Sequence, residues 1–122
     1  MGVTIAEQMD RNLFGVFGER DPKRRAAASE LTYTDDVLFV DPETSSVGRP
    51  ELERRAQAIL DKSPGFVFAH DGPLYASGDT AVLAWAYGPP GAPVARGVDV
   101  AFFRDGKICR SHTLFAAPGG AK

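Results

Sequence analysis

The second half of the chain reads as a series of strands separated by turns, and this pattern constrains the fold more than any other. Segments rich in Val, Phe, Tyr and Trp alternate with Gly, Pro and Asp. Strands are predicted over residues 66–70 and 74–76, with a break between them, and over residues 80–87, 94–103 and 108–115. Asp105-Gly106 marks a tight hairpin turn. Strands joined by such turns run antiparallel, so the sequence predicts an antiparallel sheet.

The first half carries three helix patterns and one short strand. Helices are predicted over residues 3–18, 22–31 and 50–61, and the strand over residues 37–41. Apolar residues at three- and four-residue spacing give the first and third helices a buried face, and proline opens the second and third. Helices followed by a run of hairpin-linked strands are typical of an α+β fold with the helices on one side of the sheet. We expect residues 1–122 to form one domain.

Composition and charge narrow the range of partners. The net charge is −2, and the Arg54-Arg55 pair has acidic neighbours, so we interpret it as a solvated helix face and do not expect nucleic-acid binding. Cys109 is the only cysteine and the two histidines are far apart, so we expect no metal. No apolar run is as long as a membrane span, and the N-terminus lacks a signal-peptide pattern. These features predict a soluble cytoplasmic protein without a membrane partner.

The late strands are apolar on both faces. In the strand over residues 94–103, Val98, Val100 and Phe102 alternate with Asp99, Ala101 and Phe103, so both sets of positions are apolar apart from Asp99. An antiparallel sheet normally leaves one face in water. Because the helices can cover only one face, we expect a second copy of the chain to cover the other, which predicts a homodimer through the outer face of the sheet.

Two acidic residues occupy positions in otherwise apolar strands. Asp41 ends the strand of the first half, and Asp99 interrupts a strand of the second half. A carboxylate in a partly apolar pocket can move a proton next to a carbonyl group, and a buried acid is costly to ionise. Each acid also has a purely structural alternative. For Asp41, it is to serve only as an acceptor of backbone hydrogen bonds at a turn. For Asp99, it is to serve only as a hydrogen-bond partner of a buried neighbour such as Tyr33 or Trp85.

The chain resembles the nuclear transport factor two-like superfamily, more closely its SnoaL-like polyketide cyclase and ketosteroid isomerase branches. The resemblance covers nearly the whole chain. It rests on the order of elements and on two segments, YTDDVLFVDPETSSVGRPEL at residues 33–52 and AWAYGPP…GVDVAFFRDGKICRSHTLF within residues 84–115. It implies a curved antiparallel or mixed sheet wrapped by the three helices of the first half. Such a fold is a cone-shaped α+β barrel with a pocket, and it is commonly dimeric.

The resemblance also implies roles for the two acids. Asp41 matches the general base of the ketosteroid isomerases, and Asp99 matches the acid that stays protonated and donates a hydrogen bond to the developing oxyanion. The implied function is cofactor-free proton transfer on an apolar carbonyl compound by an isomerase, cyclase or dehydratase. The isomerases also carry a tyrosine on the first helix, where this chain has Asn12-Leu13-Phe14. That difference supports one alternative, a hydrophobic-ligand-binding or dimeric accessory protein without chemistry. A further alternative is a dimerisation module whose pocket is filled by side chains.

Further residues are expected to line the pocket and bind its ligand. By analogy to the isomerases, the face of the last strand that carries Cys109 and Ser111 lines the pocket, and His112 lies on the outer face. SnoaL-like cyclases use histidine–aspartate acid–base chemistry, so His70 is a candidate partner of Asp99. The expected set is Leu13, Phe17, Tyr33, His70, Leu83, Trp85, Phe103, Ser111, Thr113 and Phe115.

Overall fold

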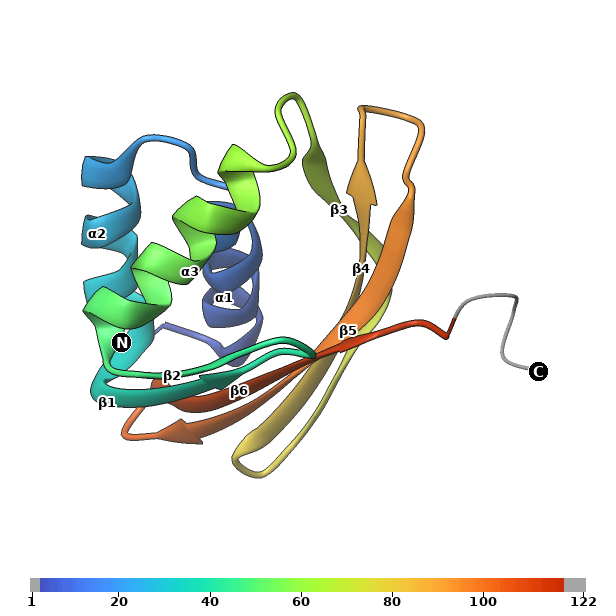
Figure 1. Ribbon diagram of the computed structural model, residues 1–122. Coiled ribbons are helices and arrows are strands. Elements are labelled where there is room, and N and C mark those ends of the chain that lie inside the picture. Colours follow the sequence, from blue (N-terminus) through green and yellow to red (C-terminus); the bar gives the residue numbers. More distant parts are fainter. Residues whose placement is uncertain (1–2, 118–122) are drawn as a thin grey trace.

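The first half of the chain forms helices that pack against one curved sheet, and the computed structural model describes residues 3–117 (Figure 1). The helical segments are α1 (Ile5–Asp10), which continues into the π-helix η1 (Arg11–Phe17), α2 (Pro22–Thr32) and α3 (Arg49–Asp61). The strands are β1 (Tyr33–Val40), β2 (Ser45–Val47), β3 (Val67–Ser77), β4 (Thr80–Gly88), β5 (Ala95–Arg104) and β6 (Lys107–Phe115). The α+β class is therefore confirmed.

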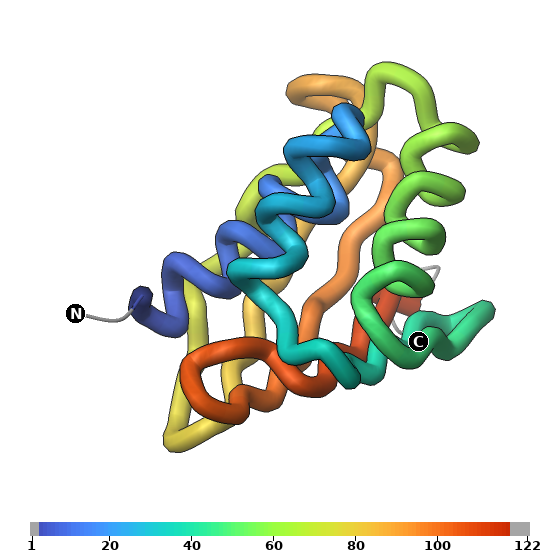
Figure 2. The backbone as a smooth tube through the Cα atoms, turned by 90° about the vertical axis from the view of Figure 1, so that its left-hand side faces the viewer, coloured from blue at the N-terminus to red at the C-terminus, as the bar shows by residue number. Residues whose placement is uncertain are grey.

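The sheet is mixed, and its order is β2-β1-β6-β5-β4-β3. The pair β1–β6 is parallel, and all the other pairs are antiparallel. The strands β2 and β3 form its two edges, so the sheet is curved but not closed. Figure 2 shows the helices crossing one face of the sheet, and α3 contacts both α2 and the π-helix η1 there. None of the helices within residues 3–117 is long and apolar enough to cross a membrane.

The helices begin where local hydrogen bonds favour them. The side chain of Thr4 accepts a hydrogen bond from the backbone of Glu7, whose side chain accepts one in return, which is a capping box. Asp21 caps α2 in the same manner through the backbone N–H of Lys23, and Pro22 follows it. The expected helix over residues 3–18 is present, but its second half is wound as a π-helix.

The strands differ from the expected ones in three main places. The strand β1 begins at Tyr33, because Tyr33 pairs with Ile108 and is fully buried. Residues 45–47, which were expected to be loop, form β2. The strand β3 continues through the expected break at residues 71–73, although its pairing with β4 shifts between His70 and Leu74. Proline has no N–H to donate there, so the ladder is interrupted without ending the strand.

One bulge changes which residues of β6 face inward. Phe102 pairs with Arg110 and Phe103 pairs with Ile108, which leaves Cys109 as the extra residue. Ile108 and Ser111 are both fully buried, although they are three residues apart. The expectation that Cys109 shares the inner face with Ser111 was wrong for this reason.

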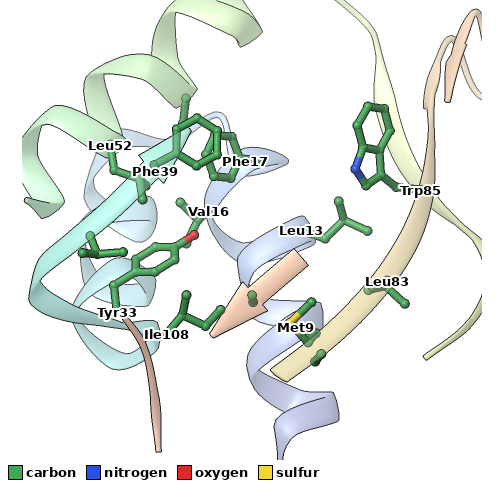
Figure 3. Close-up of a cluster of buried hydrophobic side chains, with 14 of the residues drawn as sticks. Met9, Leu13, Val16, Phe17, Tyr33, Phe39, Leu52, Leu83, Trp85 and Ile108 are labelled. Atoms are coloured by element: carbon green, nitrogen blue, oxygen red, sulfur yellow. The ribbon is translucent and has the colours of Figure 1, made fainter. Parts of the chain in front are cut away.

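The core lies between the helices and the inner face of the sheet (Figure 3). The first helical segment contributes one apolar stripe, and the strands and α3 contribute the residues that it packs against. Its labelled members are Met9, Leu13, Val16, Phe17, Tyr33, Phe39, Leu52, Leu83, Trp85 and Ile108. This core holds the inner side chains of β4, β5 and β6 at fixed positions. Asp99 is one of these side chains and lies on β5.

Candidate active site

A cavity of about 440 Å³ lies between the helices and the inner face of the sheet. Its walls come from η1, the end of β1 and the loop after it, α3, and the strands β3 to β6. The lining residues are Leu13, Phe17, Phe39, Asp41, Pro42, Glu43, Arg55, Ile59, Lys62, Ser63, Phe68, Trp85, Tyr87, Ala95, Asp99, Thr113 and Phe115. A largely apolar cavity of this size with a few polar groups is typical of a small-molecule site.

Asp99 lies in the middle of β5, and only 6% of its surface is exposed. Its Oδ1 atom accepts hydrogen bonds from Trp85 Nε1 at 3.0 Å and from Thr113 Oγ1 at 2.8 Å. Its Oδ2 atom accepts one from Asn12 Nδ2 at 2.9 Å. Burial raises the pKa of Asp99 above its ordinary value, even though the three hydrogen bonds work in the opposite direction. The hydrogen bond from Trp85 is one that the structural alternative for Asp99 named, and Asp99 also lines the cavity.

Tyr33 joins the same group of hydrogen bonds through Asn12. The hydroxyl of Tyr33 donates to Asn12 Oδ1, and both residues are buried. Burial, followed by the nearby charge of Asp99, raises the pKa of Tyr33 well above its ordinary value. In Figure 3 the hydroxyl of Tyr33 and the indole nitrogen of Trp85 point toward the first helical segment from opposite sides. Asn12 lies between them in the chain of hydrogen bonds.

Asp41 is also buried, but its surroundings favour the ionised form. Its Oδ1 atom accepts hydrogen bonds from the backbone N–H groups of Glu43 at 2.9 Å and Thr44 at 2.8 Å, and from the Thr44 hydroxyl at 3.2 Å. Its Oδ2 atom accepts one from Arg55 Nε at 2.7 Å. Burial by itself would raise the pKa of Asp41, but the hydrogen bonds and the charge of Arg55 outweigh it and lower the pKa.

The guanidinium of Arg55 therefore belongs to the cavity wall. Only 16% of its side chain is exposed, and it pairs with Glu43 as well as with Asp41. The interpretation of Arg55 as part of a solvated face was wrong, whereas its neighbour Arg54 is 68% exposed and pairs with Glu51. The difference is one of helix phase, because adjacent residues point in directions about 100° apart.

The structure brings half of the expected ligand-binding residues to the cavity. Those that line it are Leu13, Phe17, Trp85, Thr113 and Phe115. Those that do not line it are Tyr33, His70, Leu83, Phe103 and Ser111. Tyr33 lies behind Asn12, and Leu83 is part of the core. Ser111 is buried, and its hydroxyl has no hydrogen-bond partner within residues 3–117.

His70 lies near the edge of the sheet rather than at Asp99. Half of its side chain is exposed, and its Nε2 atom is 2.7 Å from Oδ1 of Asp10. Its ring also meets the ring of Phe14 edge-on, with the ring centroids 5.2 Å apart. His70 is therefore paired with a different acid from the one expected.

Sequence reasoning missed several lining residues that carry a readable signal. Arg55, Ile59 and Lys62 are spaced by four and three residues and share one face of α3 and its C-terminal end. Asn12, which lies outside the cavity wall, was one of two amides next to the apolar stripe of the first helix, the other being Gln8. The contact of Asn12 with Asp99 spans 87 positions and could not be read from local spacing.

The chain is thus an α+β protein whose helices and curved, unclosed sheet hold two buried acids, Asp41 and Asp99, in the wall of one apolar cavity. The chain belongs to the SnoaL-like domain family, whose model matches residues 11–111. The predicted resemblance is therefore confirmed. No curated protein matches the sequence.

Solved structures agree on the fold. A SnoaL-like family protein from Agrobacterium tumefaciens, provisionally named an isomerase, has a TM-score of 0.85 and 23% identity, over 92% of this chain and 97% of that one. A protein from Jannaschia sp. CCS1, provisionally named a SnoaL-like polyketide cyclase, has a TM-score of 0.74 and 13% identity, over 90% and 83%. A protein from Catenulispora acidiphila with a ketosteroid isomerase-like fold, in complex with trimethylamine, has a TM-score of 0.72 and 16% identity, over 96% and 91%. At these identities the likeness concerns the fold alone.

Proposed function

We propose that the protein is a cofactor-free enzyme that moves a proton within an apolar carbonyl compound, as an isomerase, cyclase or dehydratase does. One observation carries the proposal. Asp41 and Asp99 line the same cavity, and their surroundings shift their pKa values in opposite directions. A pair of acids whose pKa values are pushed apart is how an active site assigns the base and the acid.

In this mechanism Asp41 is the base and Asp99 the acid. The Oδ2 atom of Asp41 accepts a hydrogen bond from Arg55 only, so it keeps a position at which it can take a proton from the carbon next to the carbonyl group. Asp99 in its protonated form donates a hydrogen bond to the carbonyl oxygen, on which negative charge develops. Asp41 then returns the proton to a different carbon, or to a leaving oxygen.

A second candidate, a ligand-binding protein without chemistry, is favoured by the hydrogen bonds of Asp41. Arg55, two backbone N–H groups and the Thr44 hydroxyl all stabilise its ionised form. Each of them makes the carboxylate a weaker base, as in the structural alternative in which Asp41 organises a turn. In that case the cavity holds an apolar ligand and leaves its carbon–hydrogen bonds intact.

Exchange of carbon-bound hydrogen with D₂O separates the two candidates. A panel of β,γ-unsaturated ketones and 1,3-diketones is first screened for binding by the fluorescence of Trp85, the only tryptophan. The bound compounds are then incubated in D₂O and followed by mass spectrometry. Enzyme-dependent deuterium uptake that is lost in Asp41→Asn and kept in the exposed-acid control Glu30→Gln supports proton transfer. Binding without uptake would leave a binding protein.

We also propose that the outer face of the sheet pairs with a second copy of the chain. Support comes from the residues opposite one another there: Val100 faces Val82 on one side and His112 on the other, and Val98 faces Leu114, which is 52% exposed. A contiguous apolar face of this kind is typical of a protein interface. The cytoplasmic location stays a prediction from composition.

A further inference from the structure

Asp99 has one position left for a further hydrogen bond. Each oxygen of a carboxyl group has about two positions at which it can bind a donor. Oδ1 accepts from both Trp85 and Thr113, whereas Oδ2 accepts only from Asn12 among the residues that the structure describes. One position on Oδ2 therefore remains for a proton or a ligand. Asp99 lines the cavity and Asn12 does not, so the donor at the occupied position of Oδ2 belongs to a residue outside the cavity wall.

Tyr33 sets the direction of the hydrogen bond between Asn12 and Asp99. The side-chain amide of Asn12 has one accepting end and one donating end. Its Oδ1 atom accepts from the hydroxyl of Tyr33, which has no other acceptor within residues 3–117. Tyr33 is fully buried, so turning the amide around would leave the hydroxyl proton unpaired and away from water, which is unfavourable. Nδ2 is therefore the end that faces Asp99.

We propose that Tyr33 and Asn12 are positioning residues that keep the proton of Asp99 pointing into the cavity, toward the oxygen atom of a bound ligand. If the amide of Asn12 turned, its carbonyl oxygen would accept the proton of Asp99, and the acid could no longer donate to the ligand. The inference rests on the proposed function for the carbonyl nature of that ligand. Neither Tyr33 nor Asn12 lines the cavity, so both act through Asp99.

Four charged groups of the cavity lie on the loop after β1 and on the α3 side, and one further titratable group, Tyr87, lies on β4 with its hydroxyl bonded to Ser63. Asp41 and Glu43 are both paired with Arg55, and Lys62 follows at the end of α3. None of the four accepts a hydrogen bond from Asp99 or Trp85, or donates one to them. The indole N–H of Trp85, which donates to Asp99 Oδ1, therefore reports on Asp99 more directly than on any of these groups.

The test follows the indole ¹⁵N–¹H resonance of Trp85, the only tryptophan, as a function of pH. The resonance should change as Asp99 ionises, and this change should be absent in Asp99→Asn. In Tyr33→Phe, Asn12 is free to turn and accept the proton of Asp99. That stabilises the protonated acid, so the midpoint should move to higher pH. Asn12→Leu should move it in the same direction, because the ionised acid loses a donor.

Thr32→Val is the matched control. It removes a fully buried hydroxyl next to Tyr33 in the chain, which donates to the backbone oxygen of Ala28 and neither joins the Asp99 group nor lines the cavity. Its midpoint should equal that of the wild type, whereas a purely structural role for Tyr33 would lower only the melting temperature. An unchanged midpoint in Tyr33→Phe, or in Asn12→Leu should Tyr33→Phe not fold, would overturn the proposal. An equal shift in Thr32→Val, or an indole resonance that never responds to pH, would overturn it as well. The titration needs no substrate, so it is independent of the deuterium-exchange experiment. If the midpoint shifts but no ketone exchanges its hydrogen, the positioning role of Tyr33 and Asn12 stands and the proposed reaction is rejected.

Discussion

Gly97 lies directly opposite Trp85 on the neighbouring strand, and a side chain at position 97 would overlap the indole ring. A Cβ atom there would be 2.5 Å from Trp85 Cζ2 and 2.3 Å from the carbonyl oxygen of Leu114. The glycine thus makes room for the indole, which in turn donates its hydrogen bond to Asp99. The absence of a side chain at position 97 thus allows Trp85 to form part of the cavity wall.

Gly97→Ala is expected to destabilise the protein and displace Trp85. Overpacking a well-packed site costs about 1–3 kcal/mol, and the contact with the Leu114 backbone leaves little room for relief. Thermal unfolding should report a lower melting temperature, and the fluorescence of Trp85 should change at the same time. Trp85→Phe in the Gly97→Ala background should recover only part of the loss. Full stability of Gly97→Ala alone would contradict this account of the packing.

Exchanging the amide and the acid between positions 12 and 99 is expected to preserve the fold. Asp99→Asn replaces one accepting oxygen of the acid by an N–H₂ group. In one orientation of the new amide this group faces the donor Asn12, and in the other it faces the donor Trp85. In Asn12→Asp two carboxyl groups meet. Each single change should cost about 1–3 kcal/mol, because a buried polar group loses its partner. The double variant Asn12→Asp/Asp99→Asn restores every donor–acceptor pair and should recover most of the stability.

The same double variant should not recover deuterium uptake, because the acid has left position 99. Chemical denaturation measures the coupling between the two positions. If the two single losses simply add in the double variant, the arrangement of donors and acceptors described above is wrong.

The ion pair between Asp41 and Arg55 should make stability depend on pH in the acid range. The pKa of Asp41 is lowered on folding, so its contribution is present above the unfolded pKa and is lost as pH falls through the folded pKa. Arg55→Gln should remove about 2 kcal/mol at neutral pH, the worth of a hydrogen bond to a charged group. It should also flatten the acid limb of a plot of melting temperature against pH. The neighbouring, exposed Arg54→Gln should do neither.

The contribution of Asp99 to folding stability should change with pH in the opposite direction to that of Asp41. The folded pKa of Asp99 is raised, so its stabilising contribution is fully present below the unfolded pKa and is lost as pH rises through the folded pKa. In Asp99→Asn this decline is expected to disappear from the same plot. A decline of equal size in Asp99→Asn would assign it to another group.

Val100→Lys is expected to convert a dimer into a monomer. Val100 lies between Val82 and His112 on the outer face, so a charge there would be buried in the proposed interface. Sedimentation velocity at several concentrations gives the molecular mass. Leu31→Lys changes an exposed apolar residue on α2 and should leave the assembly intact. A wild-type protein that is monomeric at all concentrations would exclude this interface.

Much of this arrangement was predictable because it is local. The Asp105-Gly106 turn and the alternating strands of the second half gave the order of elements, and apolar spacing gave the helices. Asp41 and Asp99 were identifiable because each is an acid in an apolar strand. The surroundings of the two acids were harder to predict. The ion pair between Asp41 and Arg55, for example, depends on the rotation of α3 about its own axis.

The rest depends on contacts between distant residues and on irregular backbone. The bulge at Cys109 shifts the inward face of β6 by one residue, and no turn sequence marks it. Asn12 meets Asp99 only after the first helical segment docks on the sheet, and the π-helix that carries it has no recognised sequence signal. The parallel pairing of β1 with β6 was likewise set by the tertiary fold.

That parallel pairing has a consequence for how the protein is made. The strand β6, the last of the described elements, lies between β1 and β5 and supplies Thr113 to Asp99, while Asn12 comes from the first helical segment. A growing chain therefore cannot complete the cavity until β6 has left the ribosome and inserted between β1 and β5, which were made before it. Pairings this distant in sequence slow folding, so truncation after β5 should yield no partial activity but a chain without a site.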